Sequence, residues 1–141
     1  MEAMYTATAT IQGGRSGTVE TSDGALKLEL SMPKAMGGQG GSGTNPEELF
    51  AAGYGACFAS ALEHVAEQDG IKLEQAIVKH HVSIGKDPAD GGFQLAVAID
   101  AQIPGVERGT AQQLLHKAHD FCPYSKATRG NIEVKLNLIE G

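Results

Sequence analysis

The sequence has no tryptophan, few aromatic residues (5%) and no surplus of basic side chains. Its 141 residues include 11 lysines and arginines against 17 aspartates and glutamates, which gives a formal net charge of −6. A chain with this balance lacks the basic excess that displaces counterions from nucleic acid, so we expect no nucleic-acid partner. It also has no apolar run of roughly 18 residues, so we expect no membrane-spanning helix. Because aromatics are scarce, alanine, valine, leucine and isoleucine must fill the core.

The length and the cysteine content indicate the number of domains and the class of protein. The length favours a single domain over residues 1–141. The first ten residues, MEAMYTATAT, have neither the basic nor the apolar region of a secretory signal, so we expect a cytoplasmic protein. The two cysteines, Cys57 and Cys122, are far apart in the sequence. In a reducing compartment such a pair is more often catalytic, metal-binding or simply reduced than a structural disulfide.

The N-terminal third has the pattern of β-strands. Residues 5–11 alternate small with β-branched side chains, residues 18–21 form a second run, and leucines alternate with charged residues over 26–30. Ser22-Asp23-Gly24 offers turn residues between the last two runs. We therefore expect an antiparallel meander. The glycine-rich segment 37–43 lacks the spacing of a P-loop or a Rossmann motif and is interpreted as a loop.

A helix follows this loop. Its start, Thr44-Asn45-Pro46-Glu47, offers a cap at Thr44 or Asn45, proline in the first turn and capping-box spacing between Thr44 and Glu47. Residues 49–62, LFAAGYGACFASAL, carry no charge, and Gly70 is expected to end the helix. A helix that is apolar on every side belongs in the middle of a fold. Cys57 lies within this apolar portion.

The remaining pattern completes an α+β fold. We expect strands at residues 77–84 and 93–103, a helix at 107–121 and a final strand at 132–138. Pro123 is expected to end the second helix, because proline disfavours helical geometry in the residue before it. The order βββ-α-ββ-α-β predicts antiparallel sheets wrapped around a central buried helix.

The two cysteines allow more than one chemistry. On its apolar helix Cys57 is by default an inert buried thiol, because burial raises a thiol pKa unless a positive charge or helix N-terminus lies near. Cys122 lies where the chain turns, so we expect its sulfur to be accessible. If the two helices pack side by side, the pair could serve as the attacking and resolving thiols of a peroxidase. His116 and His119, with the two cysteines, could instead imitate a zinc site, although the Cys-x2-Cys spacing is missing. We expect no metal.

Several blocks of the sequence are specific to one family. They are Tyr5-Thr-Ala-Thr-Ala-Thr, Gly13-Gly14-Arg15, the segment from Gly43 to Phe58, and the segment Cys122-Pro-Tyr-Ser-Lys-Ala-Thr-Arg-Gly-Asn-Ile132. In order and spacing, and over essentially the whole chain, they resemble the organic hydroperoxide resistance (Ohr) branch of the OsmC/Ohr superfamily.

The resemblance implies a function and a role for four residues. Cys57 matches the peroxidatic cysteine, Cys122 the resolving cysteine, Arg15 the arginine that holds the thiolate, and Glu47 the acid that pairs with this arginine. The family reduces organic hydroperoxides to alcohols through a sulfenic acid and a disulfide, with no bound cofactor. A dihydrolipoyl dithiol, carried on lipoylated proteins, restores the thiols. The resemblance also implies an intertwined homodimer with its sites at the interface.

Helix geometry limits how these residues can meet. Glu47 and Cys57 are ten residues apart, about 15 Å along a straight helix, and on different faces. They share a small site only if the helix breaks, for which Gly53 or Gly55 are the candidates, or if Glu47 comes from a second chain. We favour a dimer, because so apolar a helix in a short chain needs additional cover.

Other interpretations remain open at this stage. Arg15 could be an ordinary turn residue. Glu47 could serve only as a negative charge in the first turn of the helix, where it interacts favourably with the helix dipole. The cysteines could also form a disulfide in a redox-sensing or small-molecule-binding module with negligible turnover. Among enzymes the OsmC branch is the nearest competitor, and the Gly-Gly-Arg and Cys-Pro-Tyr-Ser blocks favour Ohr.

Overall fold

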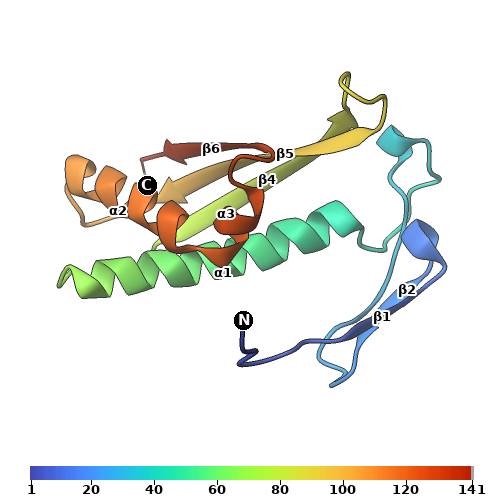
Figure 1. Ribbon diagram of the computed structural model, residues 1–141, viewed down its shortest axis with the longest axis horizontal. Helices are drawn as coiled ribbons and strands as arrows, with labels where there is room; N and C mark the ends of the chain where they lie inside the picture. The colour runs from blue at the N-terminus through green and yellow to red at the C-terminus, as the bar shows by residue number, and fades with distance from the viewer. Residues whose placement is uncertain (141) are drawn as a thin grey trace. The chain divides into compact units, whose positions relative to one another are not determined.

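The computed structural model describes residues 1–140 and divides into two compact units, residues 1–49 and the residues from Phe50 onwards. The first unit contains a three-stranded antiparallel sheet, in which β1 (Ala9–Gln12) pairs with β2 (Thr18–Thr21) and β2 pairs with β3 (Lys27–Glu29). Two 3-10 turns follow β1 and β3: η1 (Gly14–Ser16) and η2 (Lys34–Met36). The predicted meander is therefore confirmed, although its first strand is shorter than the pattern suggested (Figure 1).

The connection from β1 to β2 depends on glycine. Gly13 and Gly14 have φ angles of 81° and 57°, in the left-handed region that side-chain-bearing residues rarely adopt. A β-carbon at Gly17 would lie 1.7 Å from the carbonyl oxygen of Gln12, so this position also requires glycine. The tight turn that results carries Arg15 in η1.

Helix α1 (Pro46–Gln68) runs without a break, so the interruption considered at Gly53 or Gly55 does not occur. Its cap is Asn45, whose side-chain oxygen accepts a hydrogen bond from the N–H of Glu48 at 2.8 Å. The capping box predicted between Thr44 and Glu47 is wrong, because Thr44 donates to Glu48 and leaves Glu47 free for another partner. In residues 1–140 no helix, α1 included, has the length and hydropathy needed to cross a membrane.

The second unit contains a sheet with the order β4-β5-β6. Strand β4 (Ile77–Lys86) pairs antiparallel with β5 (Phe93–Gln102), whereas β6 (Glu133–Leu138) runs parallel to β5. The α+β class is confirmed, but the expectation of purely antiparallel strands is wrong for β6. The reason is the crossover through α2 (Arg108–Phe121) and α3 (Pro123–Thr128), which returns the chain in the direction of β5.

Helix α3 was not predicted from the sequence. Pro123 does end α2, as expected, because Cys122 leaves helical geometry at φ −67° and ψ 124°. The same proline then occupies the first position of a new helix, where its missing N–H carries no penalty. The corner between α2 and α3 therefore has Cys122 at its vertex.

One apolar core holds the second unit together. It combines the inner face of α1, the inward residues of β5 and the apolar face of α2 (Figure 1). Its largest fully buried side chains are Tyr54, Phe58, Leu62, Ile99, Leu114, Leu115, Cys122 and Ser125. Two hydroxyl groups and a thiol are thus enclosed among the aliphatic side chains, and the hydroxyl groups need hydrogen-bond partners there.

Candidate functional site

The two cysteines lie together in the second unit. Cys57 is in the middle of α1, Cys122 is at the α2–α3 corner, and their Sγ atoms are 3.6 Å apart with both thiols reduced. A disulfide bond is about 2.05 Å long, so the two Sγ atoms must approach by about 1.5 Å to form one. The structure therefore brings together the pair that the sequence suggested as attacking and resolving thiols.

The relative exposure of the two thiols differs from the sequence expectation. Cys122 was expected to be accessible, yet it is fully buried at 0% exposure, whereas Cys57 is partly exposed. The physical reason is the direction of the corner: the chain turns at Pro123 towards the core, and Cys122 becomes part of the apolar cluster. A solvent-borne reagent would accordingly reach Cys57 before Cys122.

Burial raises the pKa of the Cys57 thiol, and the adjacent Cys122 acts in the same direction. The opposing contribution comes from the backbone N–H of Tyr124, at the start of α3, which lowers this pKa. Within the second unit the group that favours the Cys57 thiolate is therefore a peptide N–H and not a charged side chain.

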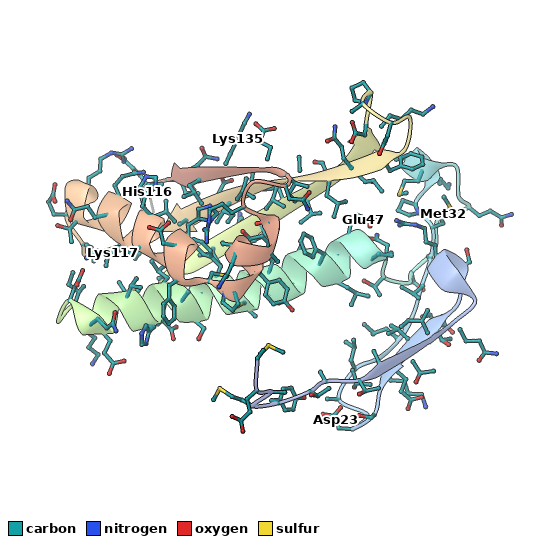
Figure 2. All side chains as sticks on the ribbon, viewed as in Figure 1. Asp23, Met32, Glu47, His116, Lys117 and Lys135 are labelled. Carbon is teal, nitrogen blue, oxygen red and sulfur yellow. The ribbon has the colours of Figure 1, made fainter. Side chains whose placement is uncertain are left out.

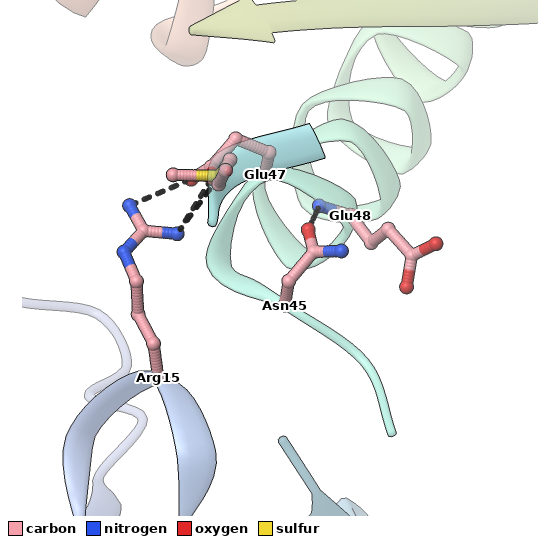
Figure 3. Close-up of polar contacts among 5 residues, drawn as sticks. Arg15, Asn45, Glu47 and Glu48 are labelled. Atoms are coloured by element: carbon pink, nitrogen blue, oxygen red, sulfur yellow. Dashed lines mark hydrogen bonds and ion pairs between the residues drawn. The ribbon is translucent and has the colours of Figure 1, made fainter. Parts of the chain in front are cut away.

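Arg15 and Glu47 form an ion pair in the first unit (Figure 3). The guanidinium donates from Nη1 to Glu47 Oε1 at 2.7 Å and from Nη2 to Oε2 at 3.3 Å, so both nitrogens engage one carboxylate. Nη1 also lies 4.0 Å from the sulfur of Met36. The hydrogen bond to Glu47 raises the pKa of Arg15, which keeps the arginine charged.

The pairing of Arg15 with Glu47, which the resemblance implied, is therefore present. The two residues reach each other because the glycine turn presents Arg15 and because Asn45, not Glu47, caps α1 (Figure 3). Arg15 and Glu47 lie in the first unit and the two cysteines in the second. That Arg15 holds the Cys57 thiolate thus stays a prediction.

The zinc alternative receives no support from the histidines of α2. His116 is exposed on α2 (Figure 2), where its Nε2 lies 3.3 Å from Gln112, and His119 Nδ1 lies 2.8 Å from the hydroxyl of Ser125. Across residues 1–140, no three histidine, cysteine, aspartate or glutamate side chains are grouped so that they could hold a metal ion.

Sequence reasoning missed the polar residues that surround the dithiol. Tyr54 and Ser125 are both 0% exposed, and their oxygens are 2.7 Å apart; Thr128, 5% exposed, lies 3.3 Å from the Tyr54 hydroxyl. The available signal was a tyrosine inside the charge-free segment of α1 and a serine three residues after Cys122.

His80 was also missed, and it has an unusual environment. It lies on β4 with its ring centroid 4.7 Å from that of Tyr54 and 5.5 Å from that of Phe58. Both ring nitrogens are buried and have no hydrogen-bond partner in the described part of the chain. Burial, with a smaller contribution from His81, lowers the pKa of His80 from 6.5 to about 4. The ring is therefore neutral at physiological pH.

This pKa predicts a pH-dependent stability. Between pH 6.5 and about 4 the unfolded chain binds a proton at His80 that the folded chain does not, so acid favours unfolding. The His80→Phe variant keeps a ring of similar shape and removes this linkage. The measurement is the free energy of unfolding of both proteins in urea. We expect the difference between His80→Phe and wild type to be constant above pH 7 and to grow in favour of the variant as the pH falls below 6.5. Profiles that stay parallel down to pH 4.5 would contradict this.

Comparison with known proteins gives a consistent result. Residues 38–137 match the family described as OsmC-like protein. The chain is 49% identical to the organic hydroperoxide resistance protein OhrB of Bacillus subtilis, over 96% of this chain and 98% of that protein. It is 50% identical to the organic hydroperoxide resistance protein of Xanthomonas axonopodis pv. citri, over 97% and 96%. A crystal structure of an organic hydroperoxide resistance protein from Legionella pneumophila matches with a TM-score of 0.92 and 52% identity, over 97% and 98%.

Proposed function

The chain belongs to the OsmC-like family, among organic hydroperoxide resistance proteins, and from this premise we propose that it is a thiol-dependent peroxidase that reduces organic hydroperoxides to alcohols. The observation that carries the proposal is the pair of reduced thiols 3.6 Å apart, one partly exposed and one buried. This is the arrangement that an attacking thiol and a resolving thiol require.

The proposed reaction has three steps. The Cys57 thiolate attacks the distal oxygen of the hydroperoxide; the O–O bond breaks, the alcohol leaves with a proton, and Cys57 becomes a sulfenic acid. The Cys122 thiol attacks this sulfur, forms the Cys57–Cys122 disulfide and releases water. An external dithiol, for which we propose the dihydrolipoyl group of a lipoylated protein, reduces the disulfide and is itself oxidised to a disulfide. The cycle needs no bound cofactor.

The surroundings of Cys57 support an organic substrate. Phe50 and Tyr124 are not fully buried, and their ring centroids are 6.5 Å apart; each ring lies 5.8 Å from the buried ring of Tyr54. They belong to α1 and α3, the helices that carry Cys57 and the peptide N–H acting on it. Apolar contact with an alkyl chain is worth about 0.8 kcal/mol per buried methylene, which hydrogen peroxide cannot gain. We therefore propose alkyl or lipid hydroperoxides as the substrate class.

Arg15 and Glu47 complete the proposed mechanism. Because burial raises the pKa of Cys57, the thiol needs a nearby cation to ionise at neutral pH, and Arg15 stays charged under all such conditions. Glu47 orients the guanidinium through two hydrogen bonds. In this scheme both residues act on the thiolate without exchanging protons with the substrate.

We further propose that the protein is a homodimer in which the Arg15–Glu47 pair of one chain serves the Cys57 of the other. Two observations support this. Helix α1 is continuous, which removes the helix break as a way to bring Glu47 to Cys57 within one chain. In addition, Ile11 and Leu28 of the first sheet are 56% and 42% exposed, apolar area that a second chain could cover. A cytoplasmic location, which keeps both thiols reduced, fits the same scheme.

The experiment that tests the function is a peroxidase assay with dihydrolipoamide as the sole reductant, run in parallel on cumene hydroperoxide and hydrogen peroxide. We expect many turnovers per protein and a preference for the organic substrate of at least about tenfold, the equivalent of two buried methylenes. No loss of cumene hydroperoxide under these conditions would refute the proposal.

A redox-sensing module is the second candidate, and one observation favours it: burial raises the pKa of Cys57, which would slow the thiol. A sensor would consume one equivalent of peroxide, form the disulfide and then stop, even with the reductant in excess. The number of turnovers in the assay therefore separates the two functions.

A further inference from the structure

A chain of hydrogen bonds, buried at Tyr54 and Ser125 and partly buried at His119, lies on the helices that carry the dithiol. The Tyr54 hydroxyl is 2.7 Å from Ser125 Oγ, and Ser125 Oγ is 2.8 Å from His119 Nδ1. The three side chains come from α1, α3 and α2 respectively. Tyr54 and Ser125 are fully buried, so their hydroxyl groups cannot exchange these partners for water. These hydrogen bonds therefore join α1, α2 and α3, the three helices around the two thiols.

The positions of these residues match those of the cysteines. Tyr54 precedes Cys57 by one helical turn, and residues three apart lie on the same side of a helix. Ser125 follows Cys122 by three residues, across the start of α3. The Tyr54–Ser125 hydrogen bond and the Cys57–Cys122 contact are thus two neighbouring links between α1 and the α2–α3 corner.

The hydrogen bonds can be satisfied completely. Thr128 Oγ1 donates to the carbonyl oxygen of Ser125 at 3.1 Å, so towards the Tyr54 hydroxyl, at 3.3 Å, it can only accept. When His119 Nδ1 carries no hydrogen, Tyr54 donates to Ser125 and Ser125 donates to His119. When Nδ1 carries a hydrogen, His119 donates to Ser125, Ser125 to Tyr54 and Tyr54 to Thr128. In both arrangements each buried hydroxyl group donates one hydrogen bond. The hydrogen-bonded link between the helices is therefore kept whether or not His119 Nδ1 carries a hydrogen.

A second contact holds the same corner. Arg129, directly after α3, donates from Nη1 to the carbonyl oxygen of His119 at 3.0 Å, which ties the end of α3 to the last turn of α2. Arg129 therefore links the end of α3 back to α2, and the Tyr54–Ser125 hydrogen bond links this corner to α1. The start of α3 carries the Tyr124 N–H that lowers the pKa of Cys57.

From these contacts we infer that Tyr54, Ser125 and His119 are positioning residues of the dithiol. They hold Cys122 and the start of α3 against Cys57, and so set how readily the disulfide forms. The hydrogen-bond partners of the Tyr54 and Ser125 hydroxyl groups in the described residues are Thr128, His119 and each other, and not a reacting sulfur. The inference extends the proposed peroxidase function by naming the residues that tune its resolving step.

The test measures the disulfide directly, without peroxide. The full-length protein is equilibrated with mixtures of reduced and oxidised dithiothreitol, the free thiols are alkylated, and the ratio of disulfide to dithiol is read by mass spectrometry. Removing one buried hydrogen-bond partner in Tyr54→Phe or Ser125→Ala is expected to lower the equilibrium constant for disulfide formation about three- to tenfold. Tyr5→Phe removes an exposed tyrosine hydroxyl and is the matched control, expected to leave the constant unchanged.

Two further readouts distinguish positioning from a general loss of stability. The rate of Cys57 alkylation against pH should shift towards higher pH in both variants, because the Tyr124 N–H is less well placed. The double variant Tyr54→Phe/Ser125→Ala should lose no more than the larger single effect, because both substitutions break the same link. If one variant does not fold, the other still decides the question.

The inference is overturned if Tyr54→Phe and Ser125→Ala, or the one of them that folds, keep the wild-type equilibrium constant and alkylation profile. It is also overturned if their effects simply add. A wild-type protein that consumes no organic hydroperoxide, yet whose disulfide equilibrium shifts in these variants, would refute the peroxidase function while leaving the positioning network intact.

Discussion

Cys57→Ser is expected to abolish the consumption of organic hydroperoxide, lowering kcat by at least about a thousandfold, the usual order of effect when a catalytic nucleophile is removed. A serine hydroxyl does not ionise near neutral pH, so the first step of the proposed cycle has no nucleophile. The substitution replaces one partly exposed sulfur by oxygen, and we expect the fold to tolerate it. The measurement is the loss of cumene hydroperoxide with dihydrolipoamide in excess, alongside a thermal melt to show that the variant is folded.

Cys122→Ser is the matched control for this experiment. It keeps the attacking thiol and removes the resolving one, so we expect a single rapid turnover that leaves Cys57 as a sulfenic acid, trapped by dimedone and detected by mass spectrometry. The two variants should therefore fail at different steps. Continued turnover in Cys57→Ser would show that the assigned nucleophile is wrong, and full multiple turnover in Cys122→Ser would show that no intramolecular disulfide is needed.

The second large effect is expected for Arg15→Met. If the guanidinium stabilises the Cys57 thiolate, its loss should raise the pKa of Cys57, since a nearby opposite charge lowers the pKa of an acid. The thiolate fraction at pH 7 and the rate of alkylation by iodoacetamide should then fall about tenfold or more. The measurement is the alkylation rate of Cys57 as a function of pH.

Three comparisons make this test specific. Arg108→Met removes an exposed arginine and should leave the profile unchanged. Arg15→Lys keeps the charge but not the two parallel hydrogen bonds, so an intermediate effect is expected. Glu47→Gln leaves the charge on Arg15 and removes the anion that orients it. An Arg15→Met profile that coincides with wild type would mean that Arg15 is an ordinary turn residue that pairs with Glu47 and does not act on Cys57.

The elements that were predicted correctly are those with a strong local pattern. The charge-free segment around Cys57, with Asn45 and Pro46 before it, specifies a helix through its own residues. The expectation that this helix is buried on every side is wrong for the single chain, because Ala52, Ala56 and Ser60 are exposed on one of its faces. The alternation of leucines with charged residues likewise specifies a strand at β3. The direction of β6 could not be predicted in this way, because parallel pairing with β5 depends on the crossover through α2 and α3 and not on the residues of the strand itself.

Pro123 shows why one residue can be interpreted correctly and still mislead. Proline stops a helix and also begins one well, and the sequence does not say which role follows. Here both occur in succession, so α3 starts immediately where α2 ends. The unpredicted six-residue helix buries Cys122 and brings the Tyr124 N–H to Cys57.

Both pairs of the candidate site were predicted from the sequence, and both are present: the two cysteines lie together, and Arg15 pairs with Glu47. The action of the second pair on Cys57 stays a prediction, and the environment of the cysteines was not predictable. The link from Tyr54 to Ser125 joins residues 71 positions apart, and no local pattern indicates that a tyrosine in an apolar helix will find a serine in another helix. His80 is similar, because its environment is formed by α1 packing over β4.

The parallel pairing of β6 with β5 affects the order in which the protein can assemble during synthesis. Strand β5 carries Val97, Ile99 and Ala101, which are almost completely buried, and one of its edges stays open until residues 133–138 have left the ribosome. Cys57 and Cys122 are both translated before that point. The nascent chain therefore holds two thiols and an unpaired strand edge at the same time, and it is vulnerable to oxidation and to pairing with other chains until its last strand docks.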